Sequence, residues 1–344
     1  MKIMKYRFEK VTHENYSLFL PIVQQNQWGN ILLPNEYNLN LWGGVVYGDD
    51  MMIGGWIGSL RGNKPIVKWF AKSVYFDSYP MFVSKDLEKD CQKELIDTMR
   101  EWAKQEGIVM FNLTHWVRGY ELPYLQVQHN ATFLLPLQDT CEAQMKLIES
   151  SQRNKIRKGE KNGIVVRVYT GSDAVREIPI LQSIREQTQE HALQRNSSAS
   201  ILLKSDRYFE NLFLHANSTL FIGYYEEKPV TVLVVQQSGK TACSYSGGSD
   251  YDINRKIACS AYVRWKAIEY YIEQPGVDYM DMGGVPPTPK EDDPAYGVYM
   301  FKRSFGGEYM EFDMGEIVIN QWKYALVKFA LSQRKLLRLF SKVL

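Results

Sequence analysis

The order of the elements expected from this sequence repeats along the chain, and this repeat constrains the fold more than any other feature. In each half, the residue pattern predicts short strands, then an amphipathic helix, then a further strand. The chain has 344 residues, which is enough for two domains of common size. We therefore expect two domains of similar architecture rather than one large core.

In the first half, glycine-punctuated strands are expected at residues 42–48 and 51–60, joined by a tight turn. Apolar residues at spacings of three and four predict a helix over residues 87–106, which ends before Gly107. The apolar run at residues 108–113 predicts a buried strand. This half therefore contains strands, a helix and a strand in that order.

The second half predicts the same order with longer elements. The expected elements are a helical stretch over 139–163, a strand over 164–169, a helix over 172–191, a three-stranded meander over 219–249, a helix over 258–273 and a strand over 277–284. A strand meander, a helix and another strand is the order in which an acetyltransferase-like domain builds its sheet.

The expected fold class is therefore α/β (α+β), with two tandem acetyltransferase-like (GNAT) domains. Each is expected to hold a mixed, mostly antiparallel sheet flanked by helices. We expect the first domain at residues 1–136 and the second at residues 137–318. Residues 319–344 predict an amphipathic basic helix that packs back on the first domain.

Composition excludes several classes of protein. The four cysteines lie far apart without a CxxC pair, no apolar run reaches the length of a membrane span, and the N-terminus lacks the apolar run of a signal peptide. These features predict a cytoplasmic protein. The net charge of +2 does not indicate a uniformly basic nucleic-acid binder, although residues 317–344 contain lysines and arginines and no acidic residue.

Four segments of the second half resemble the Fem family of peptidoglycan aminoacyltransferases, and this resemblance spans most of residues 135–320. They are SQRNKIRKGEKNGIVV (151–166), SYSGGS (244–249), YMDMGGVPPTP (279–289) and GVYMFKRSFGGEYMEFDMGEIVIN (297–320). In the last segment, Phe301-Lys302-Arg303 and Phe305-Gly306-Gly307 are similar to the family's Phe-Lys-x-x-Phe-Gly pattern.

The resemblance implies an enzyme that moves an amino acid from aminoacyl-tRNA to an amine of a peptidoglycan precursor, nucleotide-linked or lipid-linked. The substrates would meet in the cleft between the two domains. Direct attack by the amine needs no protein nucleophile, and the sequence has no GxSxG or HExxH motif. We expect no metal and no cofactor, with aminoacyl-tRNA as co-substrate.

Three residues are expected to carry the chemistry. Lys302, beside paired glycines, would face a developing oxyanion or a phosphate of the donor, although a lysine here could also be a solvated surface residue. Asp281, at a strand end, would orient the acceptor amine or cap the following turn. Tyr245, on a central strand, would donate a proton to the tetrahedral intermediate or pack in the core.

Further residues are expected to bind substrate. The substrate-binding set is Lys204, Arg207, Arg303, Gly283, Gly284, Gly306 and Gly307. The basic helix contributes an RNA-binding or phosphate-binding set of Arg153, Arg157 and Lys161, for which a solvated helix is the alternative.

The sequence departs from the family in the first domain. Residues 35–44 contain no lysine where relatives place a phosphate-binding lysine, so the acceptor's identity is open. No heptad insertion is found, so no coiled-coil arm is expected. Residues 255–260 form at best a degenerate pyrophosphate loop, which disfavours coenzyme A.

Two other functions are considered. One is an N-acyltransferase of the same fold that uses acyl-CoA or an acyl carrier protein in cell-envelope polysaccharide synthesis. The other is a non-catalytic protein that binds wall precursors. The amphipathic tail could also contact anionic lipid at the inner face of the membrane. The transferred amino acid is not specified by any motif.

Overall fold

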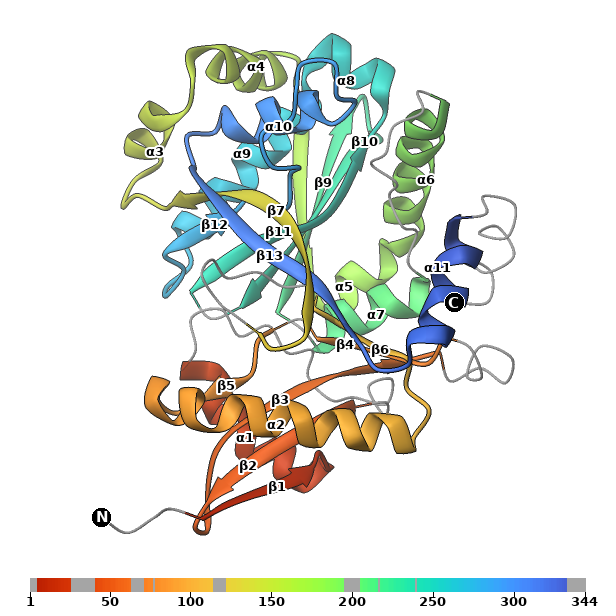
Figure 1. Cartoon of the computed structure of the whole chain (residues 1–344). Coiled ribbons are helices and arrows are strands. Elements are labelled where there is room, and N and C mark those ends of the chain that lie inside the picture. Colours follow the sequence, from red (N-terminus) through yellow and green to blue (C-terminus); the bar gives the residue numbers. More distant parts are fainter. Residues whose placement is uncertain are drawn as a thin grey trace. The chain divides into compact units, whose positions relative to one another are not determined.

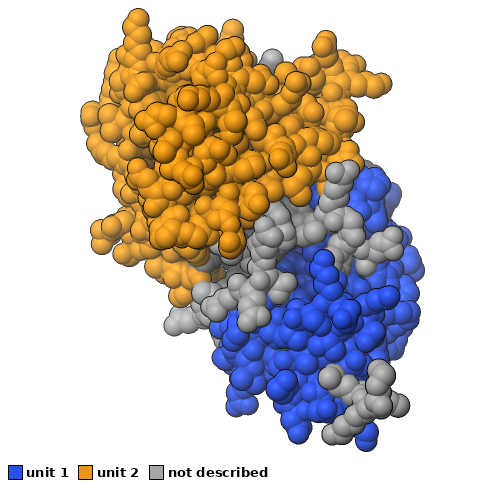
Figure 2. Space-filling view, turned by 90° about the vertical axis from the view of Figure 1, so that its left-hand side faces the viewer, with its two compact units in different colours: residues 1–129, 312–344 blue, residues 130–311 orange. Residues whose placement is uncertain are grey.

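The computed structural model describes residues 5–25, 41–62, 71–76, 78–113, 122–194, 205–215, 217–238 and 240–332. The chain forms two compact units, coloured separately in Figure 2. Unit 1 comprises Met1–His129 and Phe312–Leu344, and unit 2 comprises Asn130–Glu311. The domain boundaries expected at residues 136 and 318, and a substrate cleft between the domains, stay predictions.

In the part of the chain that the structure describes, unit 1 contains three helices and a sheet (Figure 1). Its elements are β1 (Tyr6–Lys10), α1 (His13–Gln25), β2 (Leu41–Gly48), β3 (Met51–Arg61), β4 (Ser73–Phe76), β5 (Met81–Phe82), α2 (Lys85–Gln105), β6 (Met110–Leu113) and α11 (Gln321–Ser332). Strands β7 (Leu125–Pro136) and β13 (Glu308–Val318) each have residues in both units.

The sheet of unit 1 is buried on both faces. Strand β2 pairs antiparallel with β1 and β3, and β4 pairs parallel with β6. Trp42 and Val46 of β2 pack in the core that α2 covers, whereas Val45 and Tyr47 pack in the core that α1 covers. Burial on both faces explains why this strand lacks the polar alternation of a half-exposed strand.

Unit 2 holds the remaining helices and strands of the described part of the chain. They are α3 (Cys141–Leu147), α4 (Ser150–Lys161), β8 (Val165–Thr170), α5 (Gly171–Arg176), α6 (Ile178–Gln194), α7 (Asp206–His215), β9 (Ser218–Tyr225), β10 (Lys228–Ser238), β11 (Thr241–Ser249), α8 (Tyr251–Ile257), α9 (Cys259–Ile272), β12 (Tyr279–Asp281) and α10 (Tyr296–Arg303).

The sheet of unit 2 has the strand order β7-β12-β11-β10-β9-β8. Neighbouring strands in this sheet are antiparallel, except for β11 and β12, which run parallel. These two strands pair only over Thr241–Cys243 and Tyr279–Asp281, whereas β11 continues to Ser249. The strands therefore separate after three residues, at the end where open α/β sheets bind ligands.

Helices α9 and α6 cover opposite faces of this sheet (Figure 1). Val263 of α9 lies against Gly223 of β9, and Ile184 of α6 lies against Gly248 of β11. The apolar side of α9 packs on alternate residues of the strands, including Leu233 of β10. This packing holds the paired ends of β11 and β12 in one rigid layer.

Two helices expected from the sequence are each divided in the structure. The stretch 139–163 forms α3 and α4, because Ile148 is extended (ψ 137°) and buried between them. The stretch 172–191 forms α5 and α6, with Glu177 at the break. The break precedes Pro179, which has no N–H to donate to a continuous helix. The hairpin of residues 42–60, the meander and the helices at 87–106 and 258–273 are confirmed.

Candidate active site

The loop after β12 is held by a buried carboxylate. Asp281 is 1% exposed, and its Oδ1 accepts hydrogen bonds from Thr132 Oγ1 of β7 (2.6 Å) and from the backbone N–H of Gly283 (2.7 Å). Gly283 has φ +82°, a left-handed conformation that costs glycine little. Asp281 thus caps the turn at Gly283, one of the two roles expected for it.

Lys302 reaches the same loop from the last turn of α10. Its Nζ donates to the carbonyl oxygen of Gly284 at 2.9 Å, and it lies 3.2 Å from the place where a Cβ of Gly283 would be. A Cβ at Gly284 would meet no atom within 4 Å, so open space adjoins this residue. The C-terminal end of α10, where backbone carbonyls carry partial negative charge, also favours a cation. The ammonium is therefore fixed beside an accessible glycine.

The structure adds two groups that the sequence did not indicate, Arg264 of α9 and Cys243 of β11. Cys243 is the register partner of Asp281 across the parallel pair. The charges of Arg264 and Lys302 both act on Asp281 and on the Cys243 thiol. Arg264 belongs to a helix whose pattern indicated only core packing, so no motif could have singled it out.

Burial shifts the pKa values of these groups. It raises the pKa of Asp281 to about 6, against the opposing effects of hydrogen bonds from Thr132 and Gly283 and of the nearby cations. Burial, followed by the charge of Arg264, lowers the pKa of Lys302 to about 8. Burial also lowers the pKa of Arg264 to about 10 and raises that of the Cys243 thiol well above its usual value.

Near neutral pH the group therefore consists of two cations, one carboxylate and a neutral thiol. No ion pair within 4 Å joins Asp281 to Lys302 or Arg264 in the part of the chain that the structure describes. The excess positive charge beside open space can stabilise an anion or a developing oxyanion.

Tyr245 lies on β11 beyond the paired region. It is 38% exposed, its ring stacks on Tyr208 of α7 at a centroid distance of 6.4 Å, and the two hydroxyl groups are hydrogen-bonded. Tyr245 is thus neither a core residue nor free of partners. Its role as a proton donor stays a prediction.

The glycines after Lys302 approach protein rather than open space. A Cβ at Gly306 (φ +86°) would lie 2.3 Å from the carbonyl oxygen of Leu147, and one at Gly307 would lie 3.2 Å from the backbone of Leu134. Arg303 is exposed, and its Nε lies 3.9 Å from Glu149 Oε1. The substrate contacts expected for these three residues stay predictions.

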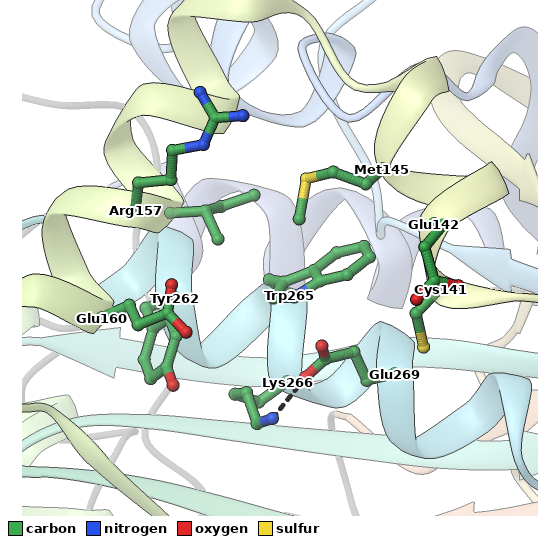
Figure 3. Close-up of a pocket in the computed structure, with 10 residues that line it drawn as sticks. Cys141, Glu142, Met145, Arg157, Glu160, Tyr262, Trp265, Lys266 and Glu269 are labelled. Carbon is green, nitrogen blue, oxygen red and sulfur yellow. Dashed lines mark ion pairs between the residues drawn. The ribbon is translucent and has the colours of Figure 1, made fainter.

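The basic helix α4 lines a groove of about 410 Å³ with α3 and α9 (Figure 3). Arg157 lies there, but so do Glu142, Glu160 and Glu269, and Lys266 is paired with Glu269. A groove with this excess of carboxylates does not attract phosphate.

The other members of the basic set lie apart from this groove. Arg153 donates to the carbonyl oxygen of Ile148 at 2.6 Å, where α3 ends, and Lys161 is exposed in the last turn of α4. RNA binding by this helix stays a prediction. Of the pair expected to hold acceptor phosphates, Arg207 is exposed in the first turn of α7 and Lys204 lies outside the described residues.

Within the residues that the structure describes, no group of three or more His, Cys, Asp or Glu side chains is arranged to hold a metal ion. Among the helices in the described ranges, none combines the length and apolar character needed to cross a bilayer.

Comparison with known proteins connects the site to a family. Residues 216–332 match the model of the FemAB family, and this segment contains Tyr245, Asp281 and Lys302. No curated protein matches the chain in sequence.

Solved structures show the fold. The chain is similar to a structure described as FemX, with a TM-score of 0.65 and 14% identity, over 93% of this chain and 99% of the other. It is also similar to a tandem GNAT protein from the clavulanic acid biosynthesis pathway, with a TM-score of 0.56 and 10% identity, over 92% and 99% of the chains. A third similar structure is L-PGS from Bacillus licheniformis, with a TM-score of 0.54 and 12% identity, over 89% and 92%.

These comparisons confirm the tandem acetyltransferase-like fold and the resemblance to the Fem family. The family match and the acetyltransferase-type fold together support an acyltransferase.

Proposed function

We propose that this acyltransferase with a FemAB-type second unit moves an amino acid from aminoacyl-tRNA to an amine of a peptidoglycan precursor. One observation carries the proposal. The ammonium of Lys302, inside the segment that matches the family, is fixed by the Gly284 carbonyl beside open space. A fixed cation at such a place suits a reaction that passes through an oxyanion.

In the proposed reaction, the amine nitrogen of the acceptor attacks the ester carbonyl of the donor. The C–N bond forms, the C–O bond to the terminal ribose breaks, the amine loses a proton and the released ribose hydroxyl gains one. Lys302 neutralises the negative charge that develops on the carbonyl oxygen. Asp281 acts on this cation indirectly, by fixing the turn at Gly283.

An acyl-CoA donor is less well supported. Coenzyme A pyrophosphate needs free N–H groups at a helix N-terminus. At the start of α9, however, the N–H of Ser260 donates to Asn254 Oδ1 at 2.9 Å, and Ala258 introduces a left-handed turn (φ +58°). Tight binding of coenzyme A with no response to charged tRNA would nevertheless favour this alternative.

The proposal extends to where the enzyme works. We place it in the cytoplasm, with α11 against anionic lipid. Trp322, Leu326 and Phe329 are 60%, 45% and 65% exposed, and their spacing puts them on one side of this helix. The sequence from residue 317 to the end contains basic residues and no acidic ones, which complements an anionic surface.

Mass analysis of muropeptides after deletion of the gene tests the proposal. We expect the loss of a mass equal to one amino-acid residue, and this mass would also identify the amino acid. Restoration by the wild-type gene and not by a Lys302→Gln gene would show that the reaction requires Lys302. An unchanged muropeptide profile after deletion would contradict the proposal.

A further inference from the structure

The strongest unexplained feature of unit 2 is an arginine side chain with a buried, unsatisfied donor. The Nη1 of Arg264 is buried and has no hydrogen-bond partner among the described residues. A guanidinium has five donors, and leaving one of them buried without an acceptor costs free energy. Such a group persists in a native structure when something else satisfies it or when it has a function.

A second unsatisfied donor lies at the separation of β11 and β12. Ser244 follows Cys243, the last residue of β11 that pairs with β12. Its Oγ is also buried and has no hydrogen-bond partner in the described part of the chain. The Ser244 carbonyl oxygen would lie 2.8 Å from a Cβ of Gly283. Ser244 therefore adjoins the same turn that Lys302 contacts.

The carboxylate in this region does not neutralise Arg264 by direct pairing. Oδ1 of Asp281 already accepts from Thr132 and Gly283, and Asp281 forms no ion pair with Arg264 within 4 Å in the described part of the chain. One carboxylate also cannot balance both Arg264 and Lys302. Buried positive charge in excess of its counter-charge favours binding of an anion.

We propose that Arg264, Ser244 and Lys302 form a binding site for a phosphate group of a substrate, at the point where β11 and β12 separate. The set consists of a guanidinium nitrogen, a hydroxyl and an ammonium, and three donors from separate elements suit a tetrahedral anion with several oxygens. Lys302 uses one of its three donors on Gly284 and keeps two for a ligand. Open space adjoins Gly284, the residue that Lys302 contacts.

The inference rests on the proposed function only for the identity of the ligand. Both proposed substrates carry phosphate: the 3′ end of a tRNA has phosphodiesters, and nucleotide-linked or lipid-linked precursors have a pyrophosphate. The shared chemistry is a phosphate oxyanion, and the experiment distinguishes the two sources.

The test measures binding to the full chain by calorimetry, with three probes: inorganic pyrophosphate, an RNA acceptor-stem hairpin and a nucleotide-linked precursor. We expect Arg264→Gln to weaken pyrophosphate binding and binding of one of the two substrate probes by about 10- to 100-fold, as for a lost hydrogen bond between charged groups. The probe that is weakened identifies the source of the phosphate. Arg264→Lys should recover part of the affinity.

Lys266→Gln is the matched control, because it also removes one positive charge from α9 but lies in the groove of Figure 3, paired with Glu269. The affinities of this variant for the three probes should stay within about twofold of wild type, because the loss of a surface ion pair has little effect. A measurement on the wild-type protein avoids any folding defect: the side-chain NMR signal of Arg264 should shift as pyrophosphate is added.

Three results would overturn the inference: an Arg264 signal that does not move at saturating pyrophosphate, no binding of any probe to the wild-type protein, or normal binding of every probe by Arg264→Gln. Failure of the proposed function is distinguishable from this. If pyrophosphate binding depends on Arg264 but no aminoacyl transfer occurs, the site stands and the function fails. If transfer occurs while Arg264→Gln binds every probe normally, the function stands and the site fails.

Discussion

At the scale of single residues, the chemistry of the site depends on charges that burial makes unfavourable. Asp281 is buried with two hydrogen-bond donors. Lys302 donates to a carbonyl oxygen, and the charge of Arg264 acts against its own. Their pKa values move toward each other, to about 6 and about 8. Both groups therefore change charge within the range where enzymes operate.

The pH dependence of kcat/KM follows from these two values. We expect a bell-shaped profile in which activity rises as Asp281 ionises near pH 6 and falls as Lys302 loses its proton near pH 8. The profile is measured with both substrates well below saturation over pH 5 to about 9.5, so that kcat/KM reports the free enzyme. An increase in kcat/KM through pH 8 would instead indicate that neutral Lys302 acts as a base.

The stability of the protein should also depend on Asp281. Its folded-state pKa of about 6 is above the ordinary value of 3.8, so the protonated side chain stabilises the fold at low pH. This stabilisation is fully present below about pH 4 and is lost as the pH rises through 6, with a total of roughly 3 kcal/mol.

Asp281→Asn keeps the acceptor for Thr132 and Gly283 without the charge. We therefore expect the free energy of unfolding of this variant not to decrease as the pH rises through 6. Urea denaturation from pH 4 to about 7 measures this. If the free energy of unfolding depended on pH in the same way for the wild type and the variant, the raised pKa of Asp281 would be contradicted.

The sequence identified only part of the site because of how its contacts are made. Lys302, Asp281 and Gly283 lie in segments with a recognisable pattern, and the structure joins them at one loop. Thr132 contacts Asp281 across 149 positions of sequence, and Arg264 comes from a helix that otherwise packs in the core. Contacts of this kind arise from sheet register and helix packing, which single motifs do not encode.

At the scale of elements, helices α2 and α9 and the strands of the hairpin and the meander were predictable, whereas helix α1 and strand β7 were not expected from the sequence. Alternating or continuous apolar runs predicted the hairpin of unit 1 and the meander of unit 2, and the structure contains both. The division of two expected helices depends on Ile148 and Glu177, where buried packing and a following proline override the local pattern. Helix α10 was missed, because the paired glycines after it, Gly306 and Gly307, indicated a turn beside Lys302.

The junction between α10 and β13 depends on a close approach of backbones. Gly306→Ala should lower the free energy of unfolding by about 3 kcal/mol, because the added Cβ would meet the Leu147 carbonyl oxygen and the backbone has φ +86°. Gly163→Ala is the matched control: its φ is +74°, but a Cβ there meets nothing within 4 Å. We expect it to cost about 1 kcal/mol. If urea denaturation gave the same loss of unfolding free energy for both variants, the close contact at Gly306 would be unimportant.

At the scale of the whole molecule, the proposed contact with anionic lipid depends on α11. Tyr324 and Lys328 of α11 bind Glu316 of β13, which ties the helix to unit 1. Its exposed apolar residues are left facing outward. Packing of the remaining tail on the first domain stays a prediction, because residues 333–344 lie outside the described part of the chain.

Vesicle co-sedimentation tests the lipid contact. Replacing both Trp322 and Phe329 by Ser should reduce binding to anionic vesicles roughly 10-fold or more, since each large apolar side chain contributes more than 1 kcal/mol when buried. The control is Met51→Ser, at a residue 73% exposed at the hairpin tip of unit 1. Equal binding by both variants would contradict a role for α11.

The central claim is that the ammonium of Lys302 stabilises the transition state of aminoacyl transfer. The most direct measurement is the single-turnover rate of Lys302→Gln with aminoacyl-tRNA and a nucleotide-linked precursor. Lys240→Gln, which removes a surface ion pair with Asp278, serves as the control. We predict a loss of about 10²-fold, or roughly 3 kcal/mol, for Lys302→Gln and a wild-type rate for the control. A wild-type rate for a folded Lys302→Gln protein would contradict the account.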